Sequence, residues 1–569
     1  MRRNVLALLA FSALALAPAE NVETLPPPAE VAKQVDQLLQ AVWKAEGIEP
    51  AKRSSDGEFL RRLSLDLTGA IPREDRVRQF LLERGKDKRA RLLQELLSRR
   101  TTARFTSLRW AYVMVNRETL FRGLAINKLI KQMNQAKGEM SGEGMMGGTM
   151  TSDDAEGMDD LDLDRPVPPL VEWLEERWVE GTPWSQVARD LIAADGELAD
   201  TPQGQYMFQF RQGKAAEAAG SVVRVFQGIQ IQCAQCHDHP YTEWSQEDFW
   251  GVAAFFGRMA IRRVSAKDER PPRFGINERP AGQIRMPAPE GERGRMALPR
   301  YLDGSVIPPG GGVHRRQEIA ELITAEDNPY FAKATVNRVW SFYFGDGIVG
   351  PVDDLESTQC VSPEILELLA ADFKASGYDM RRLTEIVLST QAYNLSSAGS
   401  EEGRAQQIAT FARAPMRSLT AEQLLFSVLE ATGVEDVEST DPRVQRRLAR
   451  QRFQLLRKFI QTFGDDEGEE VVDEGTIPQA LLMLNGPLSN DAVRARPNHP
   501  LYKRLFAMTD VDDRIDTIYL RTLSRLPSKQ ERQVVKTLFK QNTKAKQQAQ
   551  VYADVIWSLL NSSEFAYTH

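Results

Sequence analysis

The sequence predicts an all-α, mainly helical fold, with two helical regions joined by a segment that is rich in Pro, Gly and Arg. Apolar residues recur three or four positions apart through most of the chain, which is the spacing of an amphipathic helix. Alternating apolar and polar runs, which would indicate strands, are scarce. Residues 262–312 lack long apolar runs and therefore mark the best boundary between the two regions.

Four segments follow from these patterns. We expect a signal peptide over 1–19, a helical domain over 29–261, a linker or small β segment over 262–312, and a second helical domain over 313–569. At 569 residues the chain is long enough for several domains with their own cores.

Start and stop signals place the helices of the first region. Asp56, Pro72 and Thr182 are start signals, and Gly69 is a stop signal. Apolar periodicity then predicts helices around residues 31–43, 59–67, 72–81, 92–97, 170–178 and 183–192.

The second region has the same character. The box Thr420-Ala421-Glu422-Gln423 predicts a capped helix start. Helices are expected around residues 319–322, 331–344, 364–373, 383–393, 424–431, 515–523 and 551–560. A short strand is expected at 283–286, inside the joining segment.

Residues 138–166 interrupt the helical pattern with Gly, Ser, Asp and scattered Met. Thioether groups in an exported protein can hold Cu(I). The acidic, low-complexity composition instead favours a disordered insertion with incidental methionines.

The N-terminus has the layout of a secretory signal. Arg2-Arg3 precedes an apolar run to Ala17, and Ala17-Pro18-Ala19 forms a small-residue cleavage site. The run is too short to span a bilayer, and no later stretch is apolar enough to do so. The sequence therefore predicts a periplasmic or otherwise exported protein with no transmembrane anchor in the mature chain.

The charge of the chain does not favour nucleic acid or an anionic membrane as a partner. The net charge is −7, so no general basic surface is available for nucleic acid or an anionic membrane. No segment of the sequence identifies a redox partner.

Residues 233–240 read Cys-Ala-Gln-Cys-His-Asp-His-Pro and hold two of the three cysteines and two of the five histidines. C-x-x-C-H is the attachment motif of c-type haem. In that interpretation Cys233 and Cys236 are thioether anchors and His237 is the proximal iron ligand. Haem attachment to such motifs takes place outside the cytoplasm, which agrees with the predicted export.

The motif lies between two predicted helices. Val222, Phe226, Ile229 and Cys233 fall on one helical face, which predicts that the motif ends a buried helix. Residues 245–248 predict a capped first turn of a following aromatic helix. Trp244, Phe249, Trp250 and Phe255 can wall a haem edge, although such a stripe is more often plain core.

Several segments together resemble a known pair of exported bacterial domains. These are the planctomycete cytochrome-c-like domain and its usual C-terminal companion, both catalogued as of unknown function. The resemblance rests on residues 59–69 with Ile71-Pro72, 233–240, 244–250, 299–304, 314–316, 328–331, 336–340, 477–481 and 559–565.

The resemblance implies a mainly helical, exported protein, often encoded beside a sulfatase-like exported partner, and it implies no particular reaction. Larger relatives carry a separate N-terminal haem domain that is not found in this sequence, so Cys233–His237 is the only possible haem site expected here. Family members often have Ser-His-Pro-Glu where this chain has Val361-Ser362-Pro363-Glu364.

The cofactor stays open at this point. For haem c, Met207, Met259, His314 and His499 are candidate sixth ligands, whereas His239 is too close to His237 to reach the opposite haem face.

A compact zinc or copper site is the alternative, with ligands from Cys233, Cys236, His237 and His239, helped by Asp238 or His314. A third interpretation is a helical scaffold in which Cys233 and Cys236 form a disulfide.

Two smaller expectations complete the prediction. Cys360 is interpreted as a buried small apolar residue. The motifs of serine hydrolases, H-E-x-x-H metalloproteases and P-loop proteins are absent from the sequence, and no carboxylate pair is singled out, so no catalytic residue is assigned.

Overall fold

The computed structural model describes residues 25–116, 120, 168–211, 214–266, 273–288, 292–307, 314–433, 494 and 499–568. The predicted signal peptide and the acidic insertion at 138–166 lie outside the described residues.

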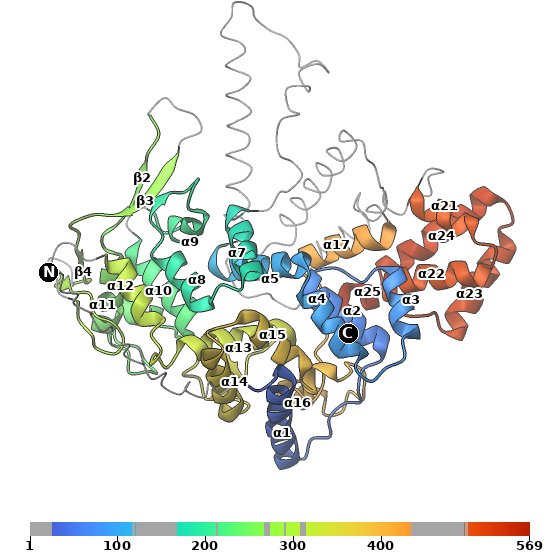
Figure 1. Cartoon of the computed structure of the whole chain (residues 1–569), viewed down its shortest axis with the longest axis horizontal. Coiled ribbons are helices and arrows are strands. Elements are labelled where there is room, and N and C mark those ends of the chain that lie inside the picture. The colour runs from blue at the N-terminus through green and yellow to red at the C-terminus, as the bar shows by residue number, and fades with distance from the viewer. Residues whose placement is uncertain are drawn as a thin grey trace, which may run out of the picture.

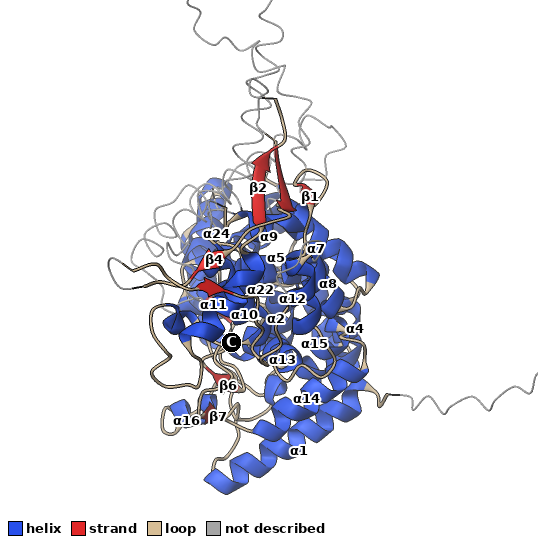
Figure 2. Ribbon diagram, turned by 90° about the vertical axis from the view of Figure 1, so that its left-hand side faces the viewer, coloured by secondary structure: helices blue, strands red, loops and turns tan. Residues whose placement is uncertain are grey.

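The described part of the chain is mainly helical, with 21 α-helices and small sheets only, which confirms the predicted fold class (Figures 1 and 2). The helices of the first half are α1 (Pro28–Glu46), α2 (Asp56–Thr68), α3 (Glu74–Leu82), α4 (Lys88–Leu97), α5 (Arg100–Met114), α7 (Pro169–Glu180), α8 (Trp184–Ile192), α9 (Gln205–Phe208), α10 (Ala215–Gln227) and α11 (Gln246–Phe256), with 3₁₀ turns η2 (Pro202–Gly204) and η3 (Gln232–Gln235).

The helices of the second half are α12 (Arg315–Ile323), α13 (Phe331–Phe344), α14 (Pro363–Ala375), α15 (Met380–Ser389), α16 (Arg404–Ala409), α17 (Ala421–Thr432), α21 (Pro500–Ala507), α22 (Val511–Leu523), α23 (Lys529–Gln541), α24 (Ala545–Leu560) and α25 (Ser563–Ala566), with the 3₁₀ turn η4 (Ala392–Asn394).

The strands are short and pair antiparallel. A three-stranded sheet has the order β1 (Gly196–Glu197), β3 (Phe274–Glu278), β2 (Met259–Arg263). The two-stranded pairs are β4 (Ile284–Arg285) with β5 (Met296–Ala297), β6 (Val349–Gly350) with β7 (Gln359–Cys360), and β8 (Arg417–Ser418) with β9 (Tyr567–Thr568). Strand β4 lies within the predicted strand at 283–286.

Helix starts differ from prediction by one or two residues. Ser55, not Asp56, caps α2, because its side chain accepts a hydrogen bond from the Glu58 amide. Helix α3 begins at Glu74, two residues after Pro72. Helix α8 begins at Trp184, and its N-cap makes no side-chain hydrogen bond. The boxes at Ser245 and Thr420 cap α11 and α17 as predicted.

The stop at Gly69 has two physical causes. Its φ of 73° lies in the left-handed region that favours glycine. A Cβ there would also lie 2.6 Å from the ring of Phe105. Both conditions require glycine at the end of α2.

The main hydrophobic core draws on both predicted domains. It contains buried residues from α1–α11 and from α12–α15, and α13 and α15 pack directly on α10 and α1. A second core gathers α17, α21–α25 and two residues from the first half, Leu65 and Ile71. The boundaries at 29–261 and 313–569 stay a sequence prediction, and the packing runs across them.

Helix α2 connects the two cores through buried polar side chains. Arg61 donates to the carbonyl oxygens of Thr522 at 2.9 Å and Phe565 at 3.0 Å. Arg62 donates to the carbonyl oxygens of Tyr393 and Leu395. These groups lie more than 300 residues apart in sequence, so the first half of the chain is fixed to two separate parts of the second.

Asp66, on the same helix, completes this connection. Its carboxylate is fully buried, pairs with Arg417 at 2.7 Å, and accepts a hydrogen bond from the Tyr393 hydroxyl at 2.9 Å. A buried carboxylate is tolerated only when it is paired and hydrogen-bonded in this way.

No helix in the described ranges is both long enough and apolar enough to cross a membrane.

Candidate functional site

The segment before the cysteines is not the continuous helix that the sequence predicts. Helix α10 ends at Gln227, and Gly228 takes a left-handed φ of 61°. A Cβ on Gly228 would come within 3.0–3.2 Å of Leu355 and Ala334. The chain therefore turns at Gly228, where Leu355 and Ala334 of the second half pack against it. Cys233 follows this turn and lies in η3.

The two motif thiols are exposed and are not joined in a disulfide. Cys233 lies in η3, and Cys236 directly follows it. Between them Ala234 is fully buried, and its amide donates to the Ile231 carbonyl at 3.0 Å. The buried alanine anchors the turn, so both thiols face outward on one short segment.

His237 is exposed, and its ring orientation is fixed by one hydrogen bond. Its Nδ1 lies 2.7 Å from the carbonyl oxygen of Asp238, so Nδ1–H is the donor. In the neutral ring this leaves Nε2 unprotonated and able to bind a metal. Metal-binding histidines are commonly oriented by a contact of this kind.

His239 is engaged differently. Its Nδ1 accepts hydrogen bonds from the amides of Tyr241 at 3.3 Å and Thr242 at 3.1 Å. The proton of the neutral ring then lies on Nε2. In this conformation His239 shapes the turn after the motif and offers neither nitrogen to a metal.

The start of α11 holds the motif in place. The Asp238 carboxylate accepts from the Gln246 amide at 2.8 Å. The Gln246 side chain donates to the Cys236 carbonyl at 2.9 Å, and the Trp250 indole donates to the Gln235 carbonyl at 3.0 Å. The extension Asp238-His239-Pro240 is thus part of a local frame that joins the motif to the capped helix.

Residues 353–356, from the second half of the chain, also contact the region around the motif. We call them the 353–356 segment. The Leu355 amide donates to the Gly228 carbonyl at 2.8 Å, and Gln230 donates to Asp353 at 2.9 Å. The Trp244 indole donates to the Glu356 carboxylate at 2.8 Å. The sequence did not predict this contact, because no local pattern links residues that lie more than a hundred positions apart.

The four aromatic residues around the motif divide into two pairs. Phe249 and Phe255 are fully buried and belong to the core. Trp244 and Trp250 are half-buried and pack against the same core. The Trp244 indole donates to Glu356 in the 353–356 segment, and the Trp250 indole donates to the motif backbone. The core interpretation therefore holds fully for the phenylalanines and in part for the tryptophans.

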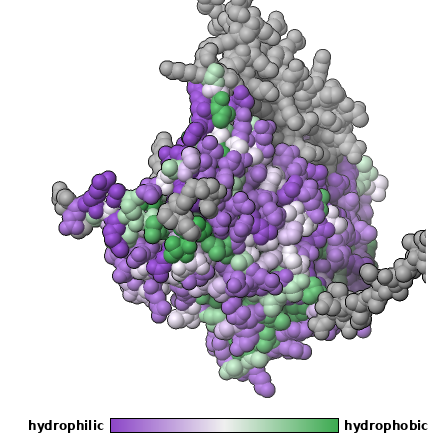
Figure 3. Space-filling model, turned by 60° about the vertical axis from the view of Figure 1, so that its left-hand side comes forward, coloured by the Kyte–Doolittle hydropathy of each residue, from purple (hydrophilic) through white to green (hydrophobic). Residues whose placement is uncertain are grey.

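Three large side chains are exposed in the segments around α11. Figure 3 shows one face of the molecule, which is mainly hydrophilic with several green, hydrophobic patches. Tyr241, next to the motif, is 92% exposed. Leu298 and Val306, each about half exposed, lie in a segment that is bonded to α11 from the Arg300 amide to the Gly251 carbonyl.

The candidate sixth ligands are scattered. Met207 is fully buried in the main core. Met259 pairs with Glu278 in the sheet, and His314 Nδ1 lies 3.3 Å from the Glu278 carboxylate. His499 is the N-cap residue of α21, at the opposite end of the molecule from α11 (Figure 1). It is therefore excluded as the sixth ligand of a haem attached at Cys233 and Cys236.

Cys360 is only half-buried, which corrects the expectation of a buried residue. It lies in β7 and packs against the main core. Burial raises the pKa of its thiol, so Cys360 favours the neutral form.

Among the described residues, no three or more His, Cys, Asp or Glu side chains converge as a preformed metal site. The thiols of Cys233 and Cys236 and Nε2 of His237 nevertheless fit covalent haem attachment, because that chemistry requires two accessible thiols and one imidazole nitrogen rather than a closed cage.

Two family models match the chain, and the candidate site lies within their matches. The family model PSCyt2, described as a protein of unknown function (DUF1549), matches residues 34–138 and 125–260. The model PSD1, also described as a protein of unknown function (DUF1553), matches residues 315–539. The chain carries this pair of domains.

They are the cytochrome-c-like domain and its C-terminal companion that the sequence resembles. The PSCyt2 match contains the whole C-x-x-C-H motif, and the PSD1 match contains the 353–356 segment. The candidate site is therefore built by both domains. No curated protein and no solved structure matches the chain.

Proposed function

We propose that the protein is an exported, c-type-cytochrome-like redox protein that carries one covalent haem at its C-x-x-C-H motif. The observation that carries the proposal is the pair of exposed, unpaired thiols on one short turn, directly followed by a histidine with Nε2 left open. A haem bound there would supply one-electron transfer.

Each residue of the site has a defined part in this proposal. Cys233 and Cys236 are the thioether anchors, and His237 is the proximal ligand, with Nδ1 held by the Asp238 carbonyl. The bonds from Gln246 and Trp250 to the motif backbone keep the two sulfur positions and the imidazole on one rigid turn.

Location and partners belong to the same proposal. Export to the periplasm or beyond supports it, because covalent haem attachment takes place there. A sulfatase-like exported protein encoded nearby is the proposed partner, and the exposed motif is accessible to a redox protein.

The test is expression of the full chain with its own leader in a bacterium that matures c-type haem. We expect a haem-stained band on a denaturing gel and a reduced spectrum with the α band of a c-type haem. Cys233→Ala should lose the covalent stain, whereas the matched variant Cys360→Ala should keep it. Absence of covalent haem in the wild-type chain would reject the proposal.

The alternative is a zinc or copper site that uses Cys233, Cys236 and His237. The specific observation in its favour is that two thiols and an imidazole nitrogen are all solvent-accessible on one turn. His239 is proposed as a fourth ligand only if its ring releases the Tyr241 and Thr242 amides. Stoichiometric zinc or copper by elemental analysis, without covalent haem, would support this alternative.

A further inference from the structure

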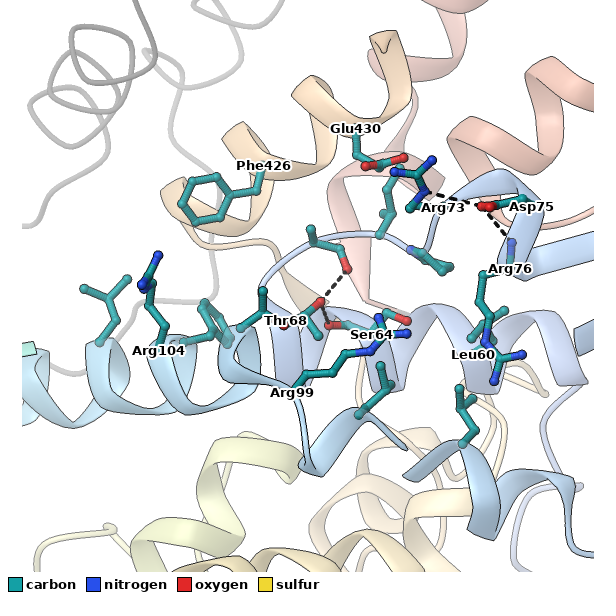
Figure 4. A pocket seen from close by; sticks show the side chains of 18 of the residues that line it. Leu60, Ser64, Thr68, Arg73, Asp75, Arg76, Arg99, Arg104, Phe426 and Glu430 are labelled. Carbon is teal, nitrogen blue, oxygen red and sulfur yellow. Dashed lines mark hydrogen bonds and ion pairs between the residues drawn. The ribbon is translucent and has the colours of Figure 1, made fainter. Parts of the chain in front are cut away.

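A cavity of about 710 Å³ lies between the first half of the chain and α17, away from the C-x-x-C-H motif. Its volume falls within the range of small-molecule binding sites. Its walls come from α2, α3, α4, α5, α7 and α17, so both domains build it (Figure 4).

One face of α2 forms part of the wall. Leu60, Ser64 and Thr68 are four residues apart and so lie on one side of the helix. The other faces of α2 carry Arg61, Arg62 and Asp66, which bind the second half of the chain. The same helix thus connects the cores with its charged faces and lines the cavity with an apolar and hydroxyl face.

The wall is mainly apolar. Leu92, Leu96, Phe105, Leu108 and Val171 complete it from α4, α5 and α7, and Phe426 approaches from α17 on the opposite side (Figure 4). A ligand that fills this space needs an apolar body, because most of the surface offers no hydrogen bond.

Six charged side chains line the cavity, and Arg76 and Arg99 form its positive end. Arg73 pairs with Asp75, Arg104 pairs with Glu175, and Glu430 lies 4.0 Å from Arg521. Arg76 and Arg99 share one carboxylate, that of Glu95, so this group of three leaves one positive charge in excess. The ligand head that neutralises this excess is a single negative charge.

The hydrogen-bond donors of the two arginines also bear on which ligand head fits the cavity. Both Nη groups of Arg76 are bonded, and its Nε–H is buried, so a ligand in the cavity does not reach that donor. Within the described residues Arg99 makes one side-chain hydrogen bond, from Nη2 to Glu95, and its side chain is 47% exposed. A carboxylate can accept from the remaining donors of Arg99.

We infer that this cavity binds an amphipathic monoanion, a molecule with an apolar chain or ring and one carboxylate head. The site is independent of the haem proposal, since it shares no lining residue with residues 228–256.

The test is isothermal titration of the full mature chain with octanoate, octan-1-ol and acetate at pH 7.5. Octanoate should bind one molecule per chain, and both octan-1-ol and acetate should bind at least about tenfold more weakly. Equal affinity for octanoate and octan-1-ol, or no saturable binding of octanoate, would overturn the inference.

Two variants localise the binding. Arg99→Gln should weaken octanoate at least about fivefold and leave octan-1-ol unchanged, because only the head loses a partner. The control is Arg91→Gln, which removes a guanidinium that pairs with Glu83 and Asp87 outside the cavity. Equal octanoate binding by the two variants would contradict the assignment of the head.

Ser64→Leu should weaken octanoate binding, because the larger side chain takes up space at the α2 wall of the cavity. If that variant does not fold, the Arg99→Gln and Arg91→Gln pair still decides the question, because both substitutions lie on partly exposed side chains.

Discussion

Helix α2 and the C-x-x-C-H turn differ most in what their polar side chains contact, although both stand out in the sequence. In α2, Arg61, Arg62 and Asp66 are buried, and each is bonded to a distant part of the chain. In the turn, Cys233 and Cys236 are exposed and unbonded to each other.

This difference separates residues that stabilise the fold from the residues that we propose to be functional. A buried charge must have partners, or the fold loses several kcal/mol. An exposed thiol with no structural bond contributes little to folding, so chemistry is the better explanation of its presence. The comparison predicts large losses of stability when Arg61 or Asp66 is replaced and small ones when Cys233 is replaced.

The largest effect is expected for Asp66→Ala. The substitution leaves the Arg417 guanidinium without its carboxylate and the Tyr393 hydroxyl without its acceptor, which should cost about 3–5 kcal/mol of unfolding free energy. Urea unfolding measures it. The control is Asp75→Ala, because Asp75 is exposed and pairs only at the surface with Arg73. Similar losses of unfolding free energy for the two variants would show that burial and pairing of Asp66 do not explain its effect.

Arg61→Met should cost about 2–4 kcal/mol, because two buried carbonyl oxygens, of Thr522 and Phe565, lose their donor. Burial lowers the pKa of Arg61 to about 10, so the side chain is charged at neutral pH. Hydrogen exchange should rise in α22 and α25 and stay unchanged in α1. A uniform rise over the whole chain would show that α2 is not a specific connector of the second core.

Asp36 shows how burial affects a carboxylate that is bonded to a backbone amide rather than to a positive side chain. Burial raises its pKa to about 6, and within the described residues its carboxylate accepts one hydrogen bond, from the Gln391 amide at 2.6 Å. The folded state therefore binds the proton more tightly than the unfolded state, and the stability present at low pH is lost as pH rises from about 4 through 6.

Asp36→Asn should then stabilise the protein by about 1–2 kcal/mol at pH 7.5, after allowance for solvent screening, with the gain shrinking toward pH 4. Urea unfolding at several pH values measures the difference. A gain that does not change with pH would show that ionisation of Asp36 is not its cause.

The smallest effect is expected for Cys233→Ala in the haem-free protein. Because the thiol is exposed, the unfolding free energy should change by less than about 0.5 kcal/mol. Ala234→Asp is the contrasting variant, since it places a charge at the fully buried residue of the same turn and should cost more than about 2 kcal/mol. A large loss for Cys233→Ala would give the motif a structural role.

Local features of the fold were predictable from the sequence. Helix periodicity located α1, α2 and α13, and the capping boxes at Ser245 and Thr420 are present as predicted. The stop at Gly69 was also predicted, because a helix end depends on a few neighbouring residues. The candidate site stays a prediction, and it could be proposed from the sequence because its motif occupies eight consecutive residues.

Two errors around the motif have a common cause. The periodic residues Ile229 and Cys233 suggested one continuous helix, but the chain turns at Gly228 because Leu355 and Ala334 pack against it. Asp353 and Glu356, which fix the surroundings of the motif, gave no sequence signal. Both errors arise from contacts between residues more than a hundred positions apart.

By itself, the sequence determined the helical class, most helix positions and the place of the C-x-x-C-H turn, because periodicity, caps and short motifs act over a few residues. Only the tertiary structure decided that the two domains share a core, that α2 connects them, and that a cavity lies on the remaining face of α2. These features depend on which distant backbone groups satisfy a buried charge, and spacing along the chain does not encode that choice.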